Sequence, residues 1–154
     1  MSEGDTSKFV YVTYIRTTPE KLWQALTQAD ITKKYWLGAK VECDFKVGSP
    51  WKLVFDDGRL ADSGEILESE PPRRLVIKWL NQWSPEINAE GYSRCTMTLE
   101  PANDTVKLTV EHAIDKPKAK LIDAVSGGWP RILSNLKSLL ETGTLLFGPK
   151  NSKS

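Results

Sequence analysis

The residue best suited to acid–base chemistry is His112, the single histidine of the 154-residue chain. It ends the segment VKLTVEH, whose apolar residues alternate with polar ones and so place His112 on the buried face of a predicted strand. Imidazole is the side chain with an ordinary pKa near neutrality. Three roles remain open: a neutral, hydrogen-bonded core residue, a polar contact for a ligand, or a general acid or base with a second group within hydrogen-bond reach.

Other reactive side chains do not form a recognisable catalytic or metal-binding set. Glu111 points to the face opposite His112, so the pair EH is not a catalytic dyad. The acids of DDGRLADSGE are expected in a turn and on an exposed edge, with fewer oxygens than a calcium loop needs. Cys43, Cys95 and one histidine do not complete a zinc set, and neither a GxSxG nor a GxxxxGK motif occurs. The sequence therefore predicts no metal, no cofactor and no catalytic residue.

Aromatic residues are the more informative group, since the chain has six tryptophans. Packing of the core explains most of them, because aromatic residues at strand or helix spacing usually lie inside. Those on inward patterns or beside helix ends are predicted to line an apolar cavity, together with one polar side chain. The predicted ligand-binding residues are Trp36, Trp51, Phe55, Trp79, Met97, His112, Trp129, Leu133 and Leu136.

Two short helices and a series of strands must position these residues. FVYVTYI, residues 9–15, has the composition of a half-buried strand. A helix is predicted from about Pro19 to Gln28, with Thr18 as its cap, and DITKKYW predicts a second helix capped by Asp30. Beyond Gly38, short alternating segments separated by turns predict further strands, linked mostly as hairpins. The fold class is α+β, with a curved antiparallel sheet of about seven strands.

A long amphipathic helix is predicted to close this sheet at the C-terminal end of the chain. Its apolar stripe comprises Trp129, Ile132, Leu133, Leu136, Leu139 and Leu140, whereas Asn135 falls on the polar face. Gly127 and Gly128 are expected to let the chain turn into this helix, Pro130 to lie in its first turn, and Gly143 to end it. A helix of roughly 21 Å would cross several strands.

Composition limits the function classes and the location. The net charge is +1 and both signs are interspersed, which does not favour nucleic acid as a partner. No segment approaches the roughly 18 apolar residues of a membrane span, and the N-terminus does not resemble a leader peptide. Two separated cysteines suggest reduced, buried thiols. We expect a cytoplasmic protein of one domain, residues 1–154, with an ordered core at about 8–147 and disorder in the first residues and in PKNSKS.

Several motifs occur in an order that resembles one known family. They are TTPEKLWQALT, DITKKYW, FKVGSPW, ESEPPRRLVIKW, MTLEP, VKLTVEH and GGWPRILSNLKSLLETG. In this respect the chain, from about Phe9 to Phe147, is similar to the C-terminal domain of the activator of the heat-shock-protein-90 ATPase, within the START-like, or SRPBCC, helix-grip superfamily. The resemblance implies a strand, two short helices, six more strands and a long C-terminal helix that together enclose a cavity. Relatives in that superfamily bind lipids, sterols, hormones and polyketides, and a minority catalyse cyclisation or aromatisation.

These observations predict a non-enzymatic domain that binds a small hydrophobic molecule, whether lipid, aromatic or polyketide-like. In this hypothesis Trp79 and Trp129 line opposite walls, His112 provides the polar contact, and Leu133 and Leu136 cover the ligand. A first alternative is a protein-interaction module that stimulates a heat-shock chaperone, for which an exposed apolar or charged patch is expected. A second alternative is a cyclase or hydrolase that acts inside the cavity, with His112 essential for turnover.

Overall fold

The computed structural model describes residues 6–147, so the predictions of disorder for the first residues and for PKNSKS lie outside the described residues. Strands and helices follow one another along the chain as the alternation predicts, with one further short helix. The elements are β1 (Ser7–Ile15), α1 (Pro19–Thr27), α2 (Ala29–Tyr35), β2 (Ala39–Cys43), β3 (Pro50–Phe55), β4 (Leu60–Glu70), β5 (Arg74–Asn81), α3 (Pro85–Asn88), β6 (Ser93–Ala102), β7 (Thr105–Ile114) and α4 (Lys120–Thr142).

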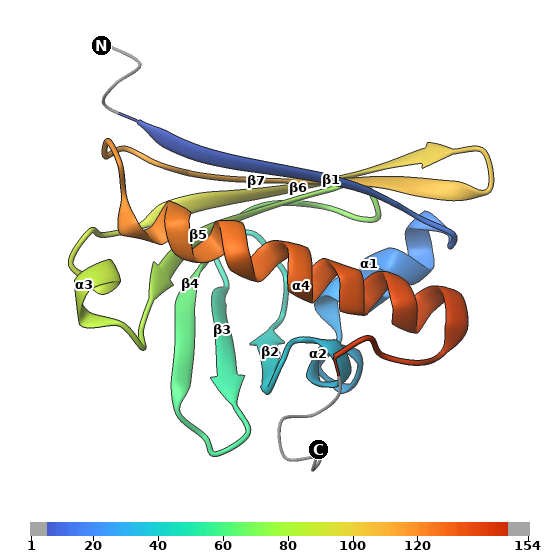
Figure 1. Cartoon of the computed structure of the whole chain (residues 1–154), viewed down its shortest axis with the longest axis horizontal. Coiled ribbons are helices and arrows are strands. Elements are labelled where there is room, and N and C mark those ends of the chain that lie inside the picture. Colours follow the sequence, from blue (N-terminus) through green and yellow to red (C-terminus); the bar gives the residue numbers. More distant parts are fainter. Residues whose placement is uncertain (1–5, 148–154) are drawn as a thin grey trace.

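The seven strands form one sheet in the order β1-β7-β6-β5-β4-β3-β2, and every neighbouring pair is antiparallel. The sheet is strongly curved, so that β2, β3 and β4 turn away from the direction of β1, β6 and β7, and α4 runs across its concave side (Figure 1). α1 and α2 lie near one end of α4, whereas α3 lies near the other. This arrangement confirms the predicted α+β fold with two short N-terminal helices and a long C-terminal helix.

The start of α1 follows the sequence signals closely. Thr18 accepts a hydrogen bond from the backbone N–H of Lys21 at 3.2 Å, and Pro19 occupies the first turn, as predicted. The prediction that Asp30 caps α2 is wrong. The backbone becomes extended at Gln28, whose N–H still bonds to the Gln24 carbonyl, so Gln28 is the residue before the helix, α2 begins at Ala29, and Asp30 lies in its first turn. There its carboxylate interacts favourably with the positive end of the helix dipole.

The closing helix begins earlier than predicted. α4 has 23 residues from Lys120 to Thr142, about 35 Å, and Gly127, Gly128 and Pro130 lie inside it rather than before it. Its start is fixed by Glu90, a residue from the loop before β6. The Glu90 carboxylate accepts the backbone N–H groups of Lys120 at 2.7 Å and Leu121 at 3.0 Å. A carboxylate from a distant segment thus provides the cap that the local sequence lacks.

Asn135 was expected on the polar face of the closing helix, and this is wrong because its side chain is fully buried. Its Oδ1 accepts the backbone N–H groups of Leu146 and Phe147 at 2.9 and 2.8 Å. Its Nδ2 donates to the carbonyls of Phe147 at 3.0 Å and Tyr35 at 3.3 Å. We call these four bonds the Asn135 clasp: it binds the segment that follows α4 back onto the helix, after the left-handed turn at Gly143.

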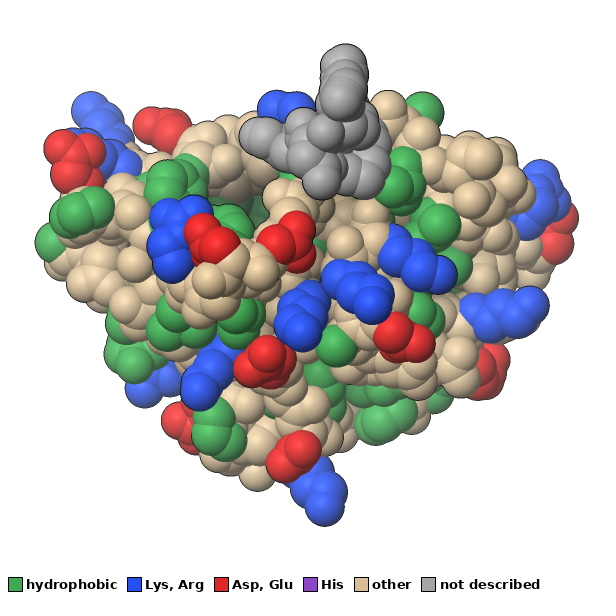
Figure 2. All heavy atoms as spheres, turned by 90° about the horizontal axis from the view of Figure 1, so that it is seen from below, with side chains coloured by type: hydrophobic (Ala, Val, Ile, Leu, Met, Phe, Trp, Pro, Cys, Tyr) green, Lys and Arg blue, Asp and Glu red, His purple; other side chains and the backbone are tan. Residues whose placement is uncertain are grey.

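The core and the surface agree with the composition. Cys95 is buried, as predicted, whereas Cys43 is only half-buried, and neither is in a disulfide. On the face seen from below, acidic and basic side chains are interspersed and hydrophobic side chains line a hollow (Figure 2). Within residues 6–147, no helix combines the length and hydrophobicity that crossing a membrane would require.

Candidate functional site

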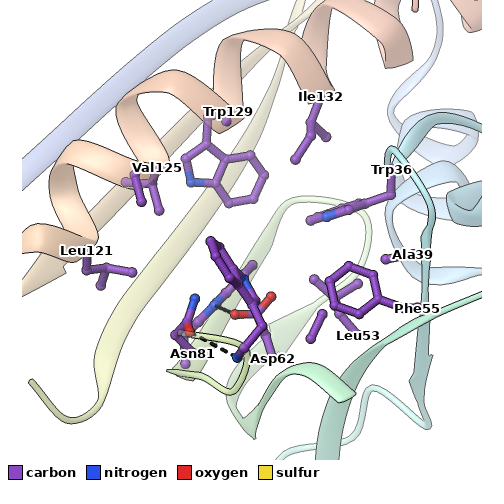
Figure 3. A pocket seen from close by; sticks show the side chains of 15 residues that line it. Trp36, Ala39, Leu53, Phe55, Asp62, Asn81, Leu121, Val125, Trp129 and Ile132 are labelled. Carbon is purple, nitrogen blue, oxygen red and sulfur yellow. Dashed lines mark hydrogen bonds between the residues drawn. The ribbon is translucent and has the colours of Figure 1, made fainter. Parts of the chain in front are cut away.

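A cavity of about 170 Å³ lies between the first half of α4 and strands β2 to β5. Helix α4 contributes aliphatic side chains and an indole to one wall, and the strands contribute aromatic and polar side chains to the other. In Figure 3, Trp129 projects from α4 and Trp36 enters from the end of α2, while Phe55 and Asp62 lie on the strand side. The lining residues include Trp36, Leu53, Phe55, Asp62, Trp79, Asn81, Trp83, Leu121, Val125, Gly128, Trp129 and Ile132.

The aromatic rings of this wall form a connected cluster. Trp129 meets Trp36 and Trp79 edge to face, with ring centroids 5.6 and 5.8 Å apart. Trp79 also packs on Trp51, at 4.4 Å between centroids. Contacts of this geometry are favourable beyond the apolar area that they bury. The cluster therefore holds the cavity wall in one arrangement.

Gly64 allows Trp51 and Trp79 to meet. It pairs with Trp51 of β3 on one side and with Trp79 of β5 on the other, so the two indoles extend over a position without a side chain. A Cβ atom at Gly64 would lie 1.7 Å from the carbonyl oxygen of Lys78, a distance that no side chain tolerates. The glycine is required by the close approach of β4 and β5 rather than by a turn.

His112 lies behind this cluster, fully buried on β7. Trp129 Nε1 donates to its Nδ1 at 3.2 Å, and its Nε2 is 2.8 Å from Ser93 Oγ. Because Nδ1 accepts, the ring proton lies on Nε2 and is donated to Ser93. Burial lowers the pKa of His112 to about 4, so the ring is neutral near pH 7. Both nitrogens are occupied within the protein, as the core-histidine interpretation expects, and His112 does not line the cavity.

Asp62 is the polar group that does line the cavity, and its predicted exposure at the surface is wrong. The residue is only 8% exposed, and its Oδ1 accepts from Trp79 Nε1 at 3.0 Å. Burial raises its pKa to about 7, against the opposing effect of the hydrogen bond from Trp79. Among residues 6–147, no group donates a hydrogen bond to Asp62 Oδ2. Every fully buried side-chain oxygen or nitrogen in this part of the chain has a hydrogen-bond partner, so Oδ2 is not fully buried. This oxygen is therefore accessible from the cavity.

Asn81 is a second polar residue that sequence reasoning missed. It is the cross-strand partner of Asp62, is buried, and lines the cavity. Its Oδ1 accepts the backbone N–H groups of Trp83 at 3.1 Å and Ser84 at 2.8 Å, and its own carbonyl accepts from Asn88 Nδ2 at 2.7 Å. These bonds fix the loop that carries Trp83 to the edge of the cavity. Asn81 continues the inward alternation of β5, which is the signal that could have identified it.

The structure separates the nine predicted ligand-binding residues into two groups. Four of them line the cavity: Trp36, Phe55, Trp79 and Trp129. The other five are buried in the hydrophobic core or beside it and do not line the cavity: Trp51, Met97, His112, Leu133 and Leu136. In α4, the residues over the cavity are Leu121 and Val125, from the turns that precede the predicted helix, and Ile132, whereas Leu133 and Leu136 pack in the hydrophobic core. Ligand contact by any of these residues stays a prediction.

The described part of the chain, residues 6–147, contains no group of three or more His, Cys, Asp or Glu side chains that could hold a metal ion. The cavity is instead apolar, with one carboxyl and one amide. Its chemistry is that of a binding site in which a few polar groups orient a hydrophobic molecule.

A long helix laid across a curved antiparallel sheet, with a cavity between them, defines the helix-grip class of START-like proteins. The model of the family described as Activator of Hsp90 ATPase homolog 1-like protein matches residues 16–141, and the chain belongs to this family. No curated protein matches the sequence.

Solved structures agree with this assignment. A crystal structure of a Mesorhizobium loti protein has a TM-score of 0.76 and 28% identity, covering 90% of this chain and 100% of that one. A solution structure of a Cytophaga hutchinsonii protein has a TM-score of 0.69 and 27% identity, with 89% and 95% covered. An HSP90 activator from Plasmodium falciparum has a TM-score of 0.70 and 25% identity, with 86% and 95% covered.

Proposed function

We propose that this protein binds a small hydrophobic molecule of one or two rings in the cavity beneath α4. The observation that carries the proposal is the cavity itself, about 170 Å³ bounded mainly by apolar and aromatic side chains. Apolar cavities of roughly 150 Å³ accept benzene, whereas drug-sized ligands occupy about 300–1,000 Å³. Of the predicted ligand classes, this size favours a small aromatic molecule over a lipid or a polyketide. The free thiols support the predicted cytoplasmic location.

Binding is tested with a panel of one- and two-ring aromatic compounds, fatty acids and steroids, using native mass spectrometry and quenching of tryptophan fluorescence. Trp36, Trp79 and Trp129 line the cavity, so a bound ring should change the emission directly. We expect the small aromatic compounds to bind and the steroids to fail. A panel in which nothing binds at millimolar concentration would remove the proposal.

Two glycines of α4 offer a matched pair of variants. Gly128 lines the cavity, whereas Gly127 is exposed and does not, and a Cβ atom at either position meets no atom within 4 Å. Gly128→Leu should fill the cavity and abolish binding, while Gly127→Leu should bind like the native protein. Equal binding by both variants would place the ligand elsewhere.

A second candidate function is an interaction with a heat-shock chaperone. The family match and the similarity to an HSP90 activator from Plasmodium falciparum support it. The outward face of β1 also carries a row of exposed apolar side chains, Val10, Val12 and Tyr14. Pull-down with the cognate chaperone tests it, with Val12→Lys as the variant expected to lose binding. No capture of the chaperone by the native protein at tens of micromolar would exclude this candidate.

A cyclase or hydrolase has less support than either. The acid–base residue expected for it, His112, uses both ring nitrogens in bonds to Ser93 and Trp129 and lies outside the cavity. His112→Ala is therefore expected to act on stability rather than on turnover.

A further inference from the structure

The charge of the cavity lining comes from one residue. Within residues 6–147, Asp62 is the only titratable side chain that lines the cavity, and no Lys, Arg or His of this range does so. The other polar lining side chain of interest, Asn81, has its Oδ1 occupied by two backbone N–H groups. A ligand that carried a carboxylate would thus meet a carboxyl of the same sign and no cation. The site disfavours anionic ligands such as fatty acids.

The titratable groups packed around the lining, His112 and Arg59, do not neutralise the negative charge of Asp62 either. His112 lies behind the indoles of Trp79 and Trp129, with ring centroids at 5.1 and 6.3 Å, and is neutral near pH 7. Arg59 lies over the Phe55 ring, 4.9 Å from its centroid, but its Nε donates to Asp57 at 2.8 Å on the exposed hairpin. Asp62 therefore has a hydrogen bond from Trp79 as its one stabilising partner in the described chain.

The aromatic wall favours the same kind of ligand as the carboxyl. Phe55, Trp36 and Trp129 line the cavity together (Figure 3). Trp79 lines it as well. The faces of indole and phenyl rings attract cations, and indole does so most strongly, particularly where water is excluded. Aromatic faces and a carboxyl that line one cavity are both groups that attract an ammonium group.

We infer that the cavity takes a protonated amine with an aromatic or compact apolar body, whose ammonium group donates to Oδ2 of Asp62. This inference rests on the proposed function and specifies its ligand class. The apolar body lies against Leu121, Val125 and Ile132 of α4, and the ammonium group lies between the carboxyl and the indoles. Binding restores the charged form of Asp62, which burial otherwise penalises.

Three probes of similar size separate this inference from the proposed function. They are 2-phenylethylamine, propylbenzene and 3-phenylpropanoate, measured by calorimetry or by tryptophan fluorescence at pH 8. We expect the amine to bind about 10- to 100-fold more tightly than the neutral compound, since one charge-assisted hydrogen bond is gained, and the anion to bind most weakly. If none of the three binds, the proposed function fails. If propylbenzene or the anion binds as tightly as the amine, the cavity binds ligands but this inference is overturned.

Asp62→Asn provides the matching variant because it keeps an oxygen that can accept from Trp79 Nε1 and removes the charge. It should lose the preference for the amine over propylbenzene. Asp57→Asn, on the exposed hairpin, is the control and should keep that preference. An Asp62→Asn variant that still prefers the amine would contradict the inference.

The native protein also supplies a test that needs no variant. As pH falls from 8 to 5.5, Asp62 gains a proton and the affinity for 2-phenylethylamine should fall by about tenfold or more, while that for propylbenzene stays constant. The lining and the packed groups named above contain no other group that gains a proton in this range, since the pKa of His112 lies at about 4. An amine affinity that does not change with pH would contradict the inference.

Discussion

Two buried polar groups, His112 and Asp62, both contact Trp79, and they differ in how completely their polar atoms are hydrogen-bonded. His112, whose ring is 5.1 Å from that of Trp79, has a partner for each of its nitrogens. Asp62 accepts the indole N–H of Trp79 with one oxygen and leaves the other facing the cavity. Both groups are more than nine-tenths buried. All hydrogen-bonding atoms of the His112 ring have partners in the core, whereas one oxygen of Asp62 has no donor. This difference distinguishes a structural polar residue from one that can bind a ligand.

The same comparison has an electrostatic side. Burial lowers the pKa of His112 from 6.5 to about 4, so its contribution to stability is lost as pH falls from about 6.5 to about 4. Burial raises the pKa of Asp62 from 3.8 to about 7. The contribution of Asp62 to the free energy of unfolding is therefore most favourable below about pH 4 and is lost as pH rises from about 4 to about 7. The changes in stability with pH that arise from His112 and from Asp62 are opposite in sign over nearly the same pH range. The native protein should therefore show a shallow dependence of stability on pH between these limits.

The largest effect on stability is expected from removing His112, the residue whose hydrogen bonds are complete. His112→Ala leaves Trp129 Nε1 and Ser93 Oγ without their partner and opens a void in the core. The free energy of unfolding should fall by roughly 3–5 kcal/mol at pH 7, measured by urea denaturation. A loss below about 1 kcal/mol would show that the hydrogen-bonded chain through His112 does not stabilise the core.

A somewhat smaller effect, of opposite sign, is expected on the Asp62 side. Asp62→Asn removes a charge that burial penalises, so the free energy of unfolding should rise by roughly 2–4 kcal/mol at pH 8. The gain should shrink as pH falls and vanish near pH 4. The variant should also reveal the His112 slope, with stability that increases from pH 4 to 6.5. A loss of stability at pH 8 would contradict the assignment of Trp79 as the single donor to the native carboxylate.

Trp79→Phe sharpens the comparison by removing the donor to Asp62 while keeping an aromatic ring. The pKa of Asp62 should rise above about 7, because the hydrogen bond that lowers it is lost. Stability at pH 5, where Asp62 is protonated, should fall by about 1–2 kcal/mol through lost packing. NMR titration of the Asp62 carboxyl measures the shift, and a pKa that falls would contradict the assigned role of Trp79.

The smallest effect is expected at the two glycines of α4. Gly127→Leu and Gly128→Leu should each stabilise the protein by roughly 0.5–1 kcal/mol, since leucine is the better helix former. Thermal unfolding without ligand measures this gain. Destabilisation at Gly128 alone would show that the space beneath α4 is too narrow for a leucine side chain.

The fold could be predicted because its signals are local. Alternation in β6 and β7, the Thr18 cap and the Gly143 stop depend on neighbours within a few residues, and the structure confirms them. The start of α4 could not be predicted, because its cap is Glu90, some 30 residues away. Neither could the burial of Asn135, whose partners follow the end of the helix.

The site was predictable only in part for a related reason. The inward tryptophans follow from strand parity, and Asp62 shares that parity with Gly64 and Ile66, which was the available signal. A charged residue close to a turn is usually solvated, however, and the donor that makes its burial tolerable, Trp79, belongs to the next strand. A register shift beside Leu53 also places Ala61 and Asp62 both inside, which simple alternation does not anticipate.

Because Gly127, Gly128 and Pro130 lie inside α4, the helix has an earlier and a later half that meet near Pro130. Pro130 cannot donate to the Ser126 carbonyl, and the glycines weaken the same turn, so bending is least costly there. The later half is held by the Asn135 clasp and by Glu141, which accepts from the backbone N–H of Arg16. The first turn is anchored separately, by the Glu90 carboxylate at Lys120 and Leu121, so the two sides of the bend are tied to different parts of the molecule.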